Sequence, residues 1–387
     1  MTITAEDLIR RGAERHRAGD LDGAESHYRR ALRLAPHHPD ALNLLGVAAR
    51  MRGDLDTALE LAAKAVAQAP DSPVFLANQG AALAEAGQLG PALAVLERTL
   101  RLRPDDVVSL RNFGQALTAA GRPADALPAL REAARLAPAP EVLLSLAHAA
   151  KEAGATEEAR AAAARVTGPL AGHARFLLAA LDGEAPDRAP AAYVRDLFDA
   201  FAPRFDAELT GALAYRTPAL LAALLGPGPF ARLLDLGCGT GLSGAALRPL
   251  AARLEGLDLS PRMLARARAT GHYDALHEGD LLEFLPRRAA AFDAVAAADV
   301  LNYLGDLAPA FAAIRAALKG GGVAAWSLEK GEAPVALHGG LRFRHAPAHA
   351  AALAEAAGLR VTAQQEAALR TEKGEEVAGV LMRAEAA

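Results

Sequence analysis

Proline recurs at a constant interval in the first part of this 387-residue chain. The prolines that stand 34 residues apart are Pro36, Pro70, Pro104 and Pro138. The same interval separates the glycines Gly12, Gly46, Gly80 and Gly114, the alanines Ala24, Ala58, Ala92 and Ala126, and the leucines Leu8, Leu42, Leu76 and Leu110. Small residues at fixed positions let two helices approach closely, leucine fills the contact, and proline ends the second helix of each pair. The spacing therefore predicts a stack of helical hairpins.

The period and the positions of the small residues resemble those of the tetratricopeptide repeat. This resemblance implies a solenoid whose concave face receives a protein or peptide partner. We expect residues 1–170 to form about four repeats plus capping helices. The last unit, from Glu141 to about Val166, lacks the recurring proline.

A glycine-rich loop follows an apolar run in the second half of the chain. Residues 233–244 read LLDLGCGTGLSG and lead into a helical pattern that continues to Leu250. Such a run predicts a buried parallel strand that turns into a helix. Glycine permits positive φ in the turn and lets a ligand lie on the backbone, and the first amides of the helix make that end mildly positive. A nucleotide-like ligand is expected here.

Two classes of nucleotide fit this loop. Gly239 to Gly244 satisfies the dinucleotide fingerprint, with Asp258 at a suitable distance, so an NAD-dependent oxidoreductase is one alternative. Asp235, however, would repel a pyrophosphate and attract the amino group of a methionine-like ligand. The string DLGCGTG resembles motif I of the class I methyltransferases that use S-adenosylmethionine (SAM). That resemblance implies a cofactor site at the residues Asp235, Gly237, Cys238, Gly239 and Gly241.

Composition excludes several other functions. A net charge of -4 at pH 7 argues against general nucleic-acid binding, although it allows a local basic groove. The single cysteine, Cys238, allows no internal disulfide, and no Cys/His cluster predicts a metal site. The acidic N-terminus does not resemble a signal peptide, and no run of about 18 apolar residues predicts a membrane span. We expect a cytoplasmic protein without membrane association.

A connecting helix and a hinge are expected over residues 171–190, and lid helices over 191–226. Five aromatic residues gather in the second segment, at Tyr193, Phe198, Phe201, Phe205 and Tyr215. They would exclude water from the methionine end of SAM, or simply pack the helix onto the sheet. The string from Tyr193 to Pro218 resembles the same segment of bacterial methyltransferases that carry tetratricopeptide repeats. This resemblance implies that Tyr193 and Phe205 contact the cofactor, and that Tyr215 and Arg216 lie near the substrate.

Further acids end the next two predicted strands. Asp258 is placed to accept hydrogen bonds from both ribose hydroxyls. In similar methyltransferases, the residue matching Asp280 accepts the adenine amino group and the one matching Leu281 packs on the ring; an N-cap is the simpler role for Asp280. Leu259 and Met263 are likewise expected against the adenine or ribose.

The last strands also favour a methyltransferase. A glycine run from Lys319 to Gly322 precedes a fifth strand over 323–328, and apolar alternations from Leu359 to Met382 flank a turn at Lys373-Gly374. A terminal hairpin suits the antiparallel edge of a methyltransferase sheet, and a dehydrogenase would not need it. The predicted fold is an all-α tetratricopeptide solenoid followed by an α/β, Rossmann-like, seven-stranded class I methyltransferase domain over 191–387.

Methyl transfer from a sulfonium is an in-line displacement, so the protein mainly aligns the reactants and excludes water. A base is required only if the acceptor must first lose a proton. The catalytic candidates are Asp299, Tyr303 and His345, and Asp299 also belongs to a loop that closes over the methionine moiety in similar enzymes. Substrate candidates are His338 and Arg344, and Arg370 could join Arg216 and Arg344 in holding an anion. Each of these side chains also has a plain surface or packing role as its alternative.

The sequence thus predicts a bacterial, SAM-dependent methyltransferase that releases S-adenosylhomocysteine, with repeats that recruit a protein, peptide or carrier-bound acceptor. One alternative is a small-molecule methyltransferase whose repeats form a homodimer. Another is a SAM-binding scaffold without turnover, and a third is the NAD-dependent oxidoreductase. The acceptor, the methylated atom and the oligomeric state are left open.

Overall fold

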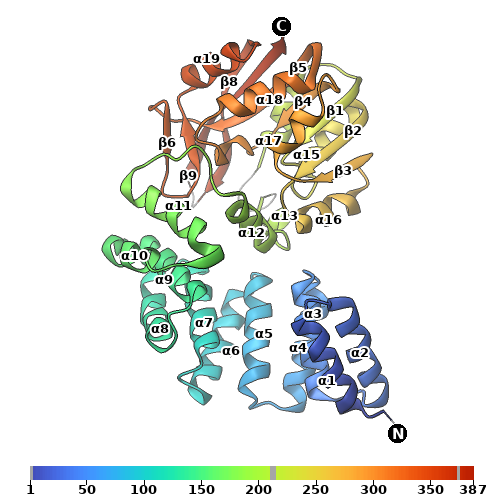
Figure 1. Cartoon of the computed structure of the whole chain (residues 1–387), viewed down its shortest axis with the longest axis vertical. Coiled ribbons are helices and arrows are strands. Elements are labelled where there is room, and N and C mark those ends of the chain that lie inside the picture. The colour runs from blue at the N-terminus through green and yellow to red at the C-terminus, as the bar shows by residue number, and fades with distance from the viewer. Residues whose placement is uncertain (1–2, 210–214, 373–374) are drawn as a thin grey trace. The chain divides into compact units, whose positions relative to one another are not determined.

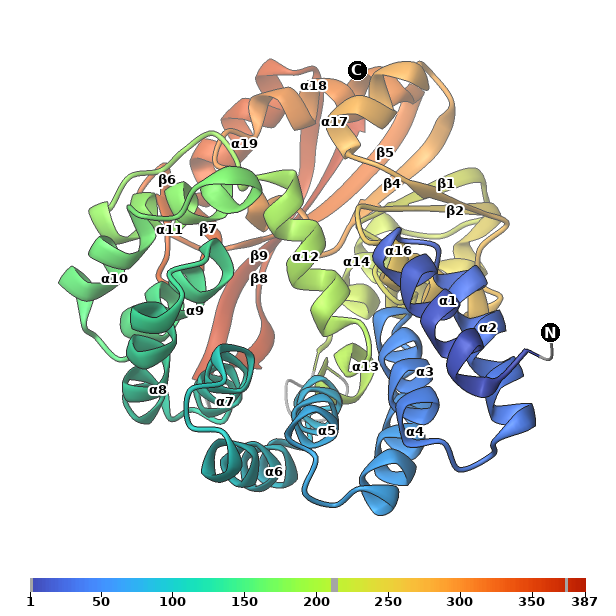
Figure 2. The same cartoon turned by 60° about the horizontal axis from the view of Figure 1, so that its bottom comes forward.

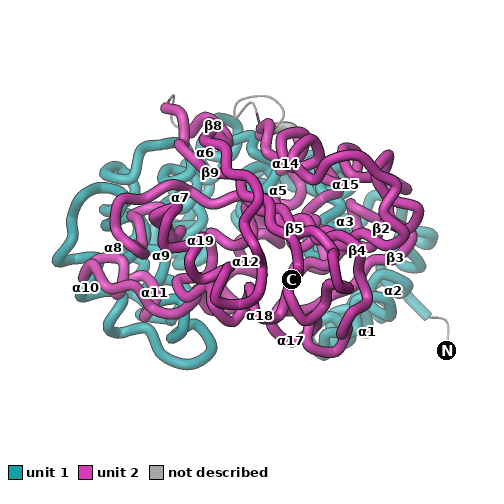
Figure 3. Tube along the Cα trace, turned by 90° about the horizontal axis from the view of Figure 1, so that it is seen from above, with its two compact units in different colours: residues 1–174 teal, residues 175–387 magenta. Residues whose placement is uncertain are grey.

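The computed structural model describes residues 3–209, 215–372 and 375–387. It divides into two compact units, Met1–Ala174 and Arg175–Ala387, which Figure 3 shows in separate colours. The boundaries predicted from the sequence for the repeat domain, the hinge and the catalytic domain remain predictions.

The first unit consists of antiparallel helical pairs that stack along the chain (Figures 1 and 2). Its helices are α1 (Ala5–Arg17), α2 (Leu21–Leu34), α3 (Pro39–Met51), α4 (Leu55–Gln68), α5 (Pro73–Glu85), α6 (Leu89–Leu102), α7 (Val107–Ala119), α8 (Pro123–Leu136), α9 (Pro140–Glu152) and α10 (Thr156–Ala163). Each recurring proline follows the end of the second helix of a pair, as α2 before Pro36 illustrates. A short 3-10 turn (Gly168–Leu170) and α11 (Ala171–Asp182) follow.

The recurring small residues lie where the two helices of a pair cross. Ala24, Ala92 and Ala126 are fully buried. A Cβ on Gly114 would lie 2.4 Å from Cγ of Leu130, so the α7–α8 contact requires glycine at this position. The spacing therefore predicted the helical repeats correctly, because similar close contacts recur at Gly12, Gly80 and Gly114.

The second unit is built on a seven-stranded sheet with the strand order β3-β2-β1-β4-β5-β9-β8. The strands are β1 (Phe230–Leu236), β2 (Ala251–Asp258), β3 (Ala275–Glu278), β4 (Phe292–Ala297), β5 (Leu318–Glu329), β8 (Leu359–Glu372) and β9 (Glu375–Ala386). β9 runs antiparallel to both of its neighbours, whereas the pairs from β3 to β5 are parallel. This arrangement confirms the predicted class I methyltransferase fold.

Helices cover both faces of the sheet. Residues of α14 (Thr217–Leu225) and α15 (Leu242–Leu247) pack with Leu233 and Leu254 on one face. On the other face, α18 (Ala308–Ala317) and α19 (Pro347–Ala356) pack around Trp326, which is fully buried. Strands covered on both faces are predominantly apolar, as the run before the glycine loop indicated.

The candidate site is surrounded by elements that follow the carboxyl ends of the parallel strands and by two helices that precede β1 in the chain. These are α12 (Ala191–Phe201), α13 (Phe205–Ala207), α16 (Pro261–Thr270), α17 (Leu281–Phe284), the 3-10 turn η5 (Leu301–Tyr303) and a hairpin of β6 (Val335–Leu337) and β7 (Phe343–His345). Short 3-10 turns also follow α15 and α17, at Arg248–Leu250 and Leu285–Arg287.

Some details differ from the sequence prediction. β5 begins at Leu318, before the glycine run, because Leu318 already pairs with Phe292 and an irregularity in the register follows. The β6–β7 hairpin was not predicted. The expected turn at residues 373–374 and part of the expected lid, residues 210–214, lie outside the described residues. Across the ranges that the structure does describe, none of the helices has the length and apolar character that a membrane crossing requires.

Candidate functional site

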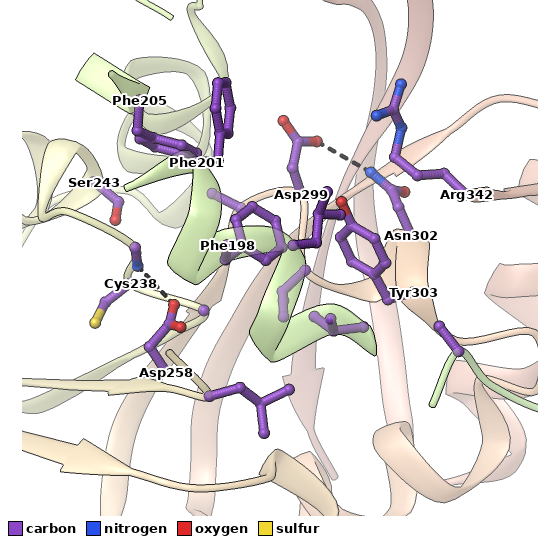
Figure 4. Close-up of a pocket in the computed structure, with 18 of the residues that line it drawn as sticks. Phe198, Phe201, Phe205, Cys238, Ser243, Asp258, Asp299, Asn302, Tyr303 and Arg342 are labelled. Atoms are coloured by element: carbon purple, nitrogen blue, oxygen red, sulfur yellow. Dashed lines mark hydrogen bonds between the residues drawn. The ribbon is translucent and has the colours of Figure 1, made fainter. Parts of the chain in front are cut away.

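A cavity of about 500 Å³ opens at the carboxyl ends of β1, β2 and β4. This volume lies within the range of pockets that bind ligands of cofactor size. Three groups of residues line it (Figure 4). The first comprises the glycine loop with the ends of β2 and β3, and the second comprises the aromatic residues of α12 and α13. The third is a polar group from η5, β8 and the segment before β7. The first group forms one end of the cavity, which we call the nucleoside end. The polar group forms the other, which we call the polar end.

The glycine loop is fixed to β2 by its own backbone. The amides of Gly237 and Cys238 both donate to the carbonyl of Leu257, at 2.8 and 3.0 Å. Gly237 has a φ of 66°, and a Cβ there would lie 2.7 Å from Cβ of Val300. Gly239 has a φ of 55°, and a Cβ would point toward the ring of Phe205, another residue of the cavity wall. The loop needs glycine for both its conformation and its open space.

Asp258 lies beside this loop at the end of β2. Its carboxylate accepts from the amide of Gly239 at 2.9 Å (Figure 4) and from the amide of Ser260 at 2.8 Å. Burial raises its pKa to about 6, against the lowering effect of these amides. Each oxygen keeps a lone pair, so the carboxylate can still accept two hydroxyl donors from a ligand.

Asp280 caps α17 and also lines the cavity. Its Oδ1 accepts from the amide of Leu282 at 2.9 Å, and its Oδ2 is paired with the guanidinium of Arg188. The backbone beside Arg188 is held in turn, because the amide of Ala189 donates to the carbonyl of Tyr303 at 2.9 Å. Asp280 therefore serves as the N-cap of α17, which was the simpler role considered from the sequence, and it also lies on the cavity wall.

Aromatic rings cover the cavity from α12 and α13. Phe201 and Phe205 meet edge to face with centroids 5.2 Å apart, and Phe198 meets Tyr303 in the same way at 5.5 Å. All four rings line the cavity (Figure 4). The two roles considered for these residues are thus combined, since the rings pack on one another and also form an apolar wall.

Asp299 stands between the two ends of the cavity, and several donors hold its carboxylate. It accepts from Ser327 Oγ at 2.9 Å, from Thr217 Oγ1 at 3.3 Å and from the Asn302 amide at 3.4 Å. The buried Tyr215 hydroxyl also hydrogen-bonds to it, and burial raises the pKa of Tyr215. Its φ of 55° is unusual for a residue other than glycine and marks a conformation that the surrounding bonds enforce.

A network of ion pairs forms the polar end of the cavity. Glu329, which is only 2% exposed, accepts from Arg342 Nε at 2.7 Å and from Arg370. Glu372 pairs with the same two arginines, but its side chain is 38% exposed. The hydroxyl oxygen of Tyr303 accepts a hydrogen bond from Arg342, and burial raises the pKa of this tyrosine. Arg342, Arg370 and Glu372 line the cavity.

The structure brings many of the predicted site residues to one cavity. Those that line it are Phe205, Tyr215, Gly237, Cys238, Gly239, Asp258, Leu259, Asp280, Leu281, Asp299 and Tyr303. Those that it does not place in the lining are Tyr193, Arg216, Asp235, Gly241, Met263, His338, Arg344 and His345. The functional roles assigned to all of them remain predictions.

Asp235 lies beneath the cavity and has no exposed surface. Its Oδ2 accepts from Ser243 Oγ at 2.5 Å and from the Tyr273 hydroxyl at 2.7 Å, whereas its Oδ1 has no hydrogen-bond partner. Burial raises its pKa to about 7. In this position, the carboxylate supports the glycine loop through its bond with Ser243 in the first turn of α15. A ligand amino group would have to reach below the loop to contact Asp235.

His345 is placed away from the cavity wall. It is fully buried, and its Nε2 lies 2.9 Å from the carbonyl of Leu304. Burial lowers its pKa. The alternation of β7 explains this placement, because Phe343 and His345 point into the core while Arg342 and Arg344 point the other way. This position suits a packing role better than the catalytic role that the sequence suggested.

The other predicted residues outside the lining have local partners. Met263 is fully buried, where the capping serine Ser260 accepts from its amide. Tyr193 packs on Phe176 with centroids 5.3 Å apart. Arg344 Nε lies 3.6 Å from Glu329, and His338 is exposed. The side chain of Arg216 does not reach the cavity wall.

Several polar residues of the wall were missed by sequence reasoning, among them Arg188, Asn302, Arg342 and Glu372. Arg188 lies in a proline-rich hinge, and nothing in that composition points to an ion pair 92 residues away. The sequence did contain a signal for Arg342, because Arg342 and Arg344 alternate with Phe343 and therefore lie on the same side of the strand. No local pattern links Glu372 to Arg342, because the fold alone brings their segments together.

Comparison with known families agrees with this architecture. The model of a methyltransferase domain matches residues 234–326, and the model of the tetratricopeptide repeat matches residues 10–73, 77–141 and 111–174. Human methyltransferase-like protein 27 is 44% identical over 85 residues, which are 20% of this chain and 34% of that protein. The match therefore spans about a third of this relative's length.

Two solved structures resemble separate parts of the chain. A SAM-dependent methyltransferase from Mesorhizobium loti is 26% identical, covers 44% of this chain and 97% of its own, and has a TM-score of 0.36. A thermophilic tetratricopeptide-repeat protein from Thermus thermophilus is 25% identical, covers 46% of this chain and 98% of its own, and has a TM-score of 0.40. On the strength of the family models and the sheet order, this chain combines tetratricopeptide repeats with a methyltransferase domain of the SAM-dependent class.

Proposed function

We propose that this protein transfers a methyl group from SAM to an acceptor that the repeat unit recruits, most simply a protein, a peptide or a carrier-bound intermediate. The observation that carries the proposal is the position of Asp258. Its carboxylate lines the cavity and is bonded to the amide of Gly239, at the edge of the sheet where α/β folds bind nucleosides.

The residues at the nucleoside end fit a SAM molecule. Asp258 offers two acceptor sites for the ribose hydroxyls, and Asp280 offers an acceptor at the next strand end. The glycine loop leaves open space above its backbone because a side chain at Gly239 would enter the cavity. Leu259 and Leu281 supply apolar contacts for a purine.

SAM supplies an electrophilic methyl group when it is bound. The remaining requirements are alignment and exclusion of water, which the protein can meet with rigid groups. Phe198, Phe201 and Phe205 form an apolar wall, and Asp299 is held between the two ends of the cavity by several hydrogen bonds. An acceptor that must lose a proton would find Asp299, Tyr303 and Tyr215 among the ionisable groups that line the cavity.

The repeat unit supports a role in recruiting a polypeptide. Its odd-numbered helices contact one another along the array, α3 with α1 and α5, and α7 with α5 and α9, and so form the inner face of the solenoid. Asn78 on α5 donates to Asn43 at 2.9 Å, and Gln115 on α7 donates to Ser145 at 3.0 Å. Amide side chains along an inner face suit the polar backbone of an extended peptide.

The proposal is tested by incubating the full chain with methyl-labelled SAM and a lysate of its source organism. Label in the protein fraction supports polypeptide methylation, and label in small metabolites supports the alternative of a small-molecule enzyme. Absence of any transfer, with S-adenosylhomocysteine still binding, would leave a scaffold without turnover. A gain in melting temperature with NAD instead of S-adenosylhomocysteine would contradict the assignment of the cofactor.

A further inference from the structure

The polar end of the cavity contains two arginines that share two carboxylates. Arg342 and Arg370 line the cavity, and each of them pairs with both Glu329 and Glu372. Guanidinium groups in this arrangement present several donors to one region of space, which suits the recognition of a carboxylate.

The two carboxylates differ in how firmly the fold holds them. Glu329 ends β5, is 2% exposed, and its amide donates to Asn302 Oδ1 at 2.9 Å, so its backbone and side chain are both fixed. Glu372 ends β8, and its side chain is 38% exposed on the cavity wall. Glu329 therefore belongs to the scaffold that positions the arginines, whereas Glu372 can leave them by a rotation of its own side chain.

The charges of the network favour replacement of Glu372 by another anion. With Glu372 in place, Arg342 and Arg370 are balanced by Glu329 and Glu372. If Glu372 turns toward solvent, Arg342 keeps Glu329, and Arg370 keeps Glu329 together with Asp299 at 3.9 Å. Arg344 also lies 3.6 Å from Glu329, so three arginines then face two carboxylates and one positive charge is in excess. A buried positive charge left in this way is unfavourable unless an anion takes the vacated position.

We propose that Arg342 and Arg370 form a carboxylate-binding site and that Glu372 occupies it as an internal mimic until a ligand carboxylate replaces it. This inference rests on the proposed function, because the site lies at the end of the same cavity as the acceptor. The carboxylate belongs to the methyl acceptor, since Asp258 and Asp280 mark the opposite end as the nucleoside end. The acceptor class is thus an anion that carries a carboxylate close to the methylated atom.

The test is calorimetric titration of the full chain with succinate, and with neutral succinamide for comparison, in the presence of S-adenosylhomocysteine. An internal competitor weakens the apparent affinity, because a ligand can bind only during the fraction of time in which the site is free. Glu372→Gln removes this competitor and is therefore expected to tighten succinate binding on the order of 10-fold. Succinamide should bind neither protein measurably. The matched control is Glu366→Gln on the same strand, which removes an exposed pair with Lys330 outside the cavity and should leave succinate binding as it is.

Two results would overturn the proposal. One is succinate binding in Glu372→Gln that is no tighter than in the unmodified chain or in Glu366→Gln. The other is binding of methylammonium that the unmodified chain shows and Glu372→Gln loses, which would make Glu372 a ligand for a cationic acceptor.

A second titration identifies the source of the carboxylate. Glu372→Gln is compared for S-adenosylhomocysteine and for methylthioadenosine, which lacks the amino-acid carboxylate. Tighter binding of the first ligand alone would support the site but assign it to the cofactor, and unchanged binding of both would support an acceptor carboxylate. The succinate titration needs no turnover and can be repeated without nucleoside, so failure of the proposed function would be seen separately as a loss of S-adenosylhomocysteine binding.

Discussion

The two ends of the cavity are built in different ways. At the nucleoside end, Asp258 and the glycine loop come from adjacent strands and are joined by backbone amides. At the polar end, Arg342, Arg370 and Glu329 come from segments far apart in the chain and are joined by side-chain ion pairs. The first end depends on backbone geometry that the parallel strands and the glycine loop supply. The second end depends on side chains that this chain supplies, and it is therefore where the specificity for an acceptor should lie.

The largest effect that separates the two ends is expected from Glu329→Gln. This change leaves Arg342 and Arg370 without their buried partner, and breaking such a pair costs about 3 kcal/mol or more of unfolding free energy. Urea denaturation measures it. Glu366→Gln, which breaks an exposed pair, should change the unfolding free energy by less than about 1 kcal/mol. Equal effects of the two variants would mean that the network at the polar end is not structural.

The second effect belongs to the nucleoside end. Asp258→Ala removes the acceptor of the two ribose hydroxyls, and the loss of two charge-assisted hydrogen bonds should weaken S-adenosylhomocysteine binding on the order of 100-fold. Calorimetry measures the affinity. Glu278→Gln removes a charge from the exposed end of β3 and serves as the control, with unchanged affinity expected. A change of less than about threefold in Asp258→Ala would place the ribose elsewhere.

A smaller effect should appear when the pH is lowered. Asp258 has a pKa of about 6, and a hydroxyl donor prefers its ionised form. Affinity for S-adenosylhomocysteine should therefore be constant above this pKa and fall as the pH drops below it, approaching about 10-fold per pH unit. Asp258→Ala should lose this dependence. An affinity that rises toward low pH would contradict the role of the carboxylate.

Asp235, below the nucleoside end, should have the smallest effect on S-adenosylhomocysteine affinity, and its effect on stability should depend on pH. Its pKa of about 7 exceeds the usual 3.8, so the folded state binds the proton more tightly than the unfolded state. Stability from this group is then lost as the pH rises from 3.8 to about 7 and is constant above that. At pH 8, the unfolding free energy of Asp235→Asn should exceed that of the unmodified chain by up to about 4 kcal/mol, with little difference near pH 4. A strong loss of S-adenosylhomocysteine affinity in this variant would instead support direct contact with the ligand.

The sequence predicted what local spacing determines. A period of 34 residues determined the repeat fold because each repeat makes the same contacts, such as Gly114 on Leu130. The glycine loop and Asp258 were found because strand, loop and acid follow one another in the chain. Arg188 and Glu372 were missed because their partners Asp280 and Arg342 are distant in sequence. His345 was predicted from its residue type and its place after the fifth strand, whereas the alternation around Phe343 directs it into the core.

The most direct test of the central claim is a crystal structure of the full chain with S-adenosylhomocysteine. We expect the ribose hydroxyls to donate to Asp258, and the adenine amino group to lie at Asp280 after Arg188 has moved or shared that carboxylate. The thioether sulfur should point toward Asp299 and the polar end. A ligand bound outside this cavity, or one whose adenine lies among Arg342 and Arg370, would contradict the assignment of the two ends.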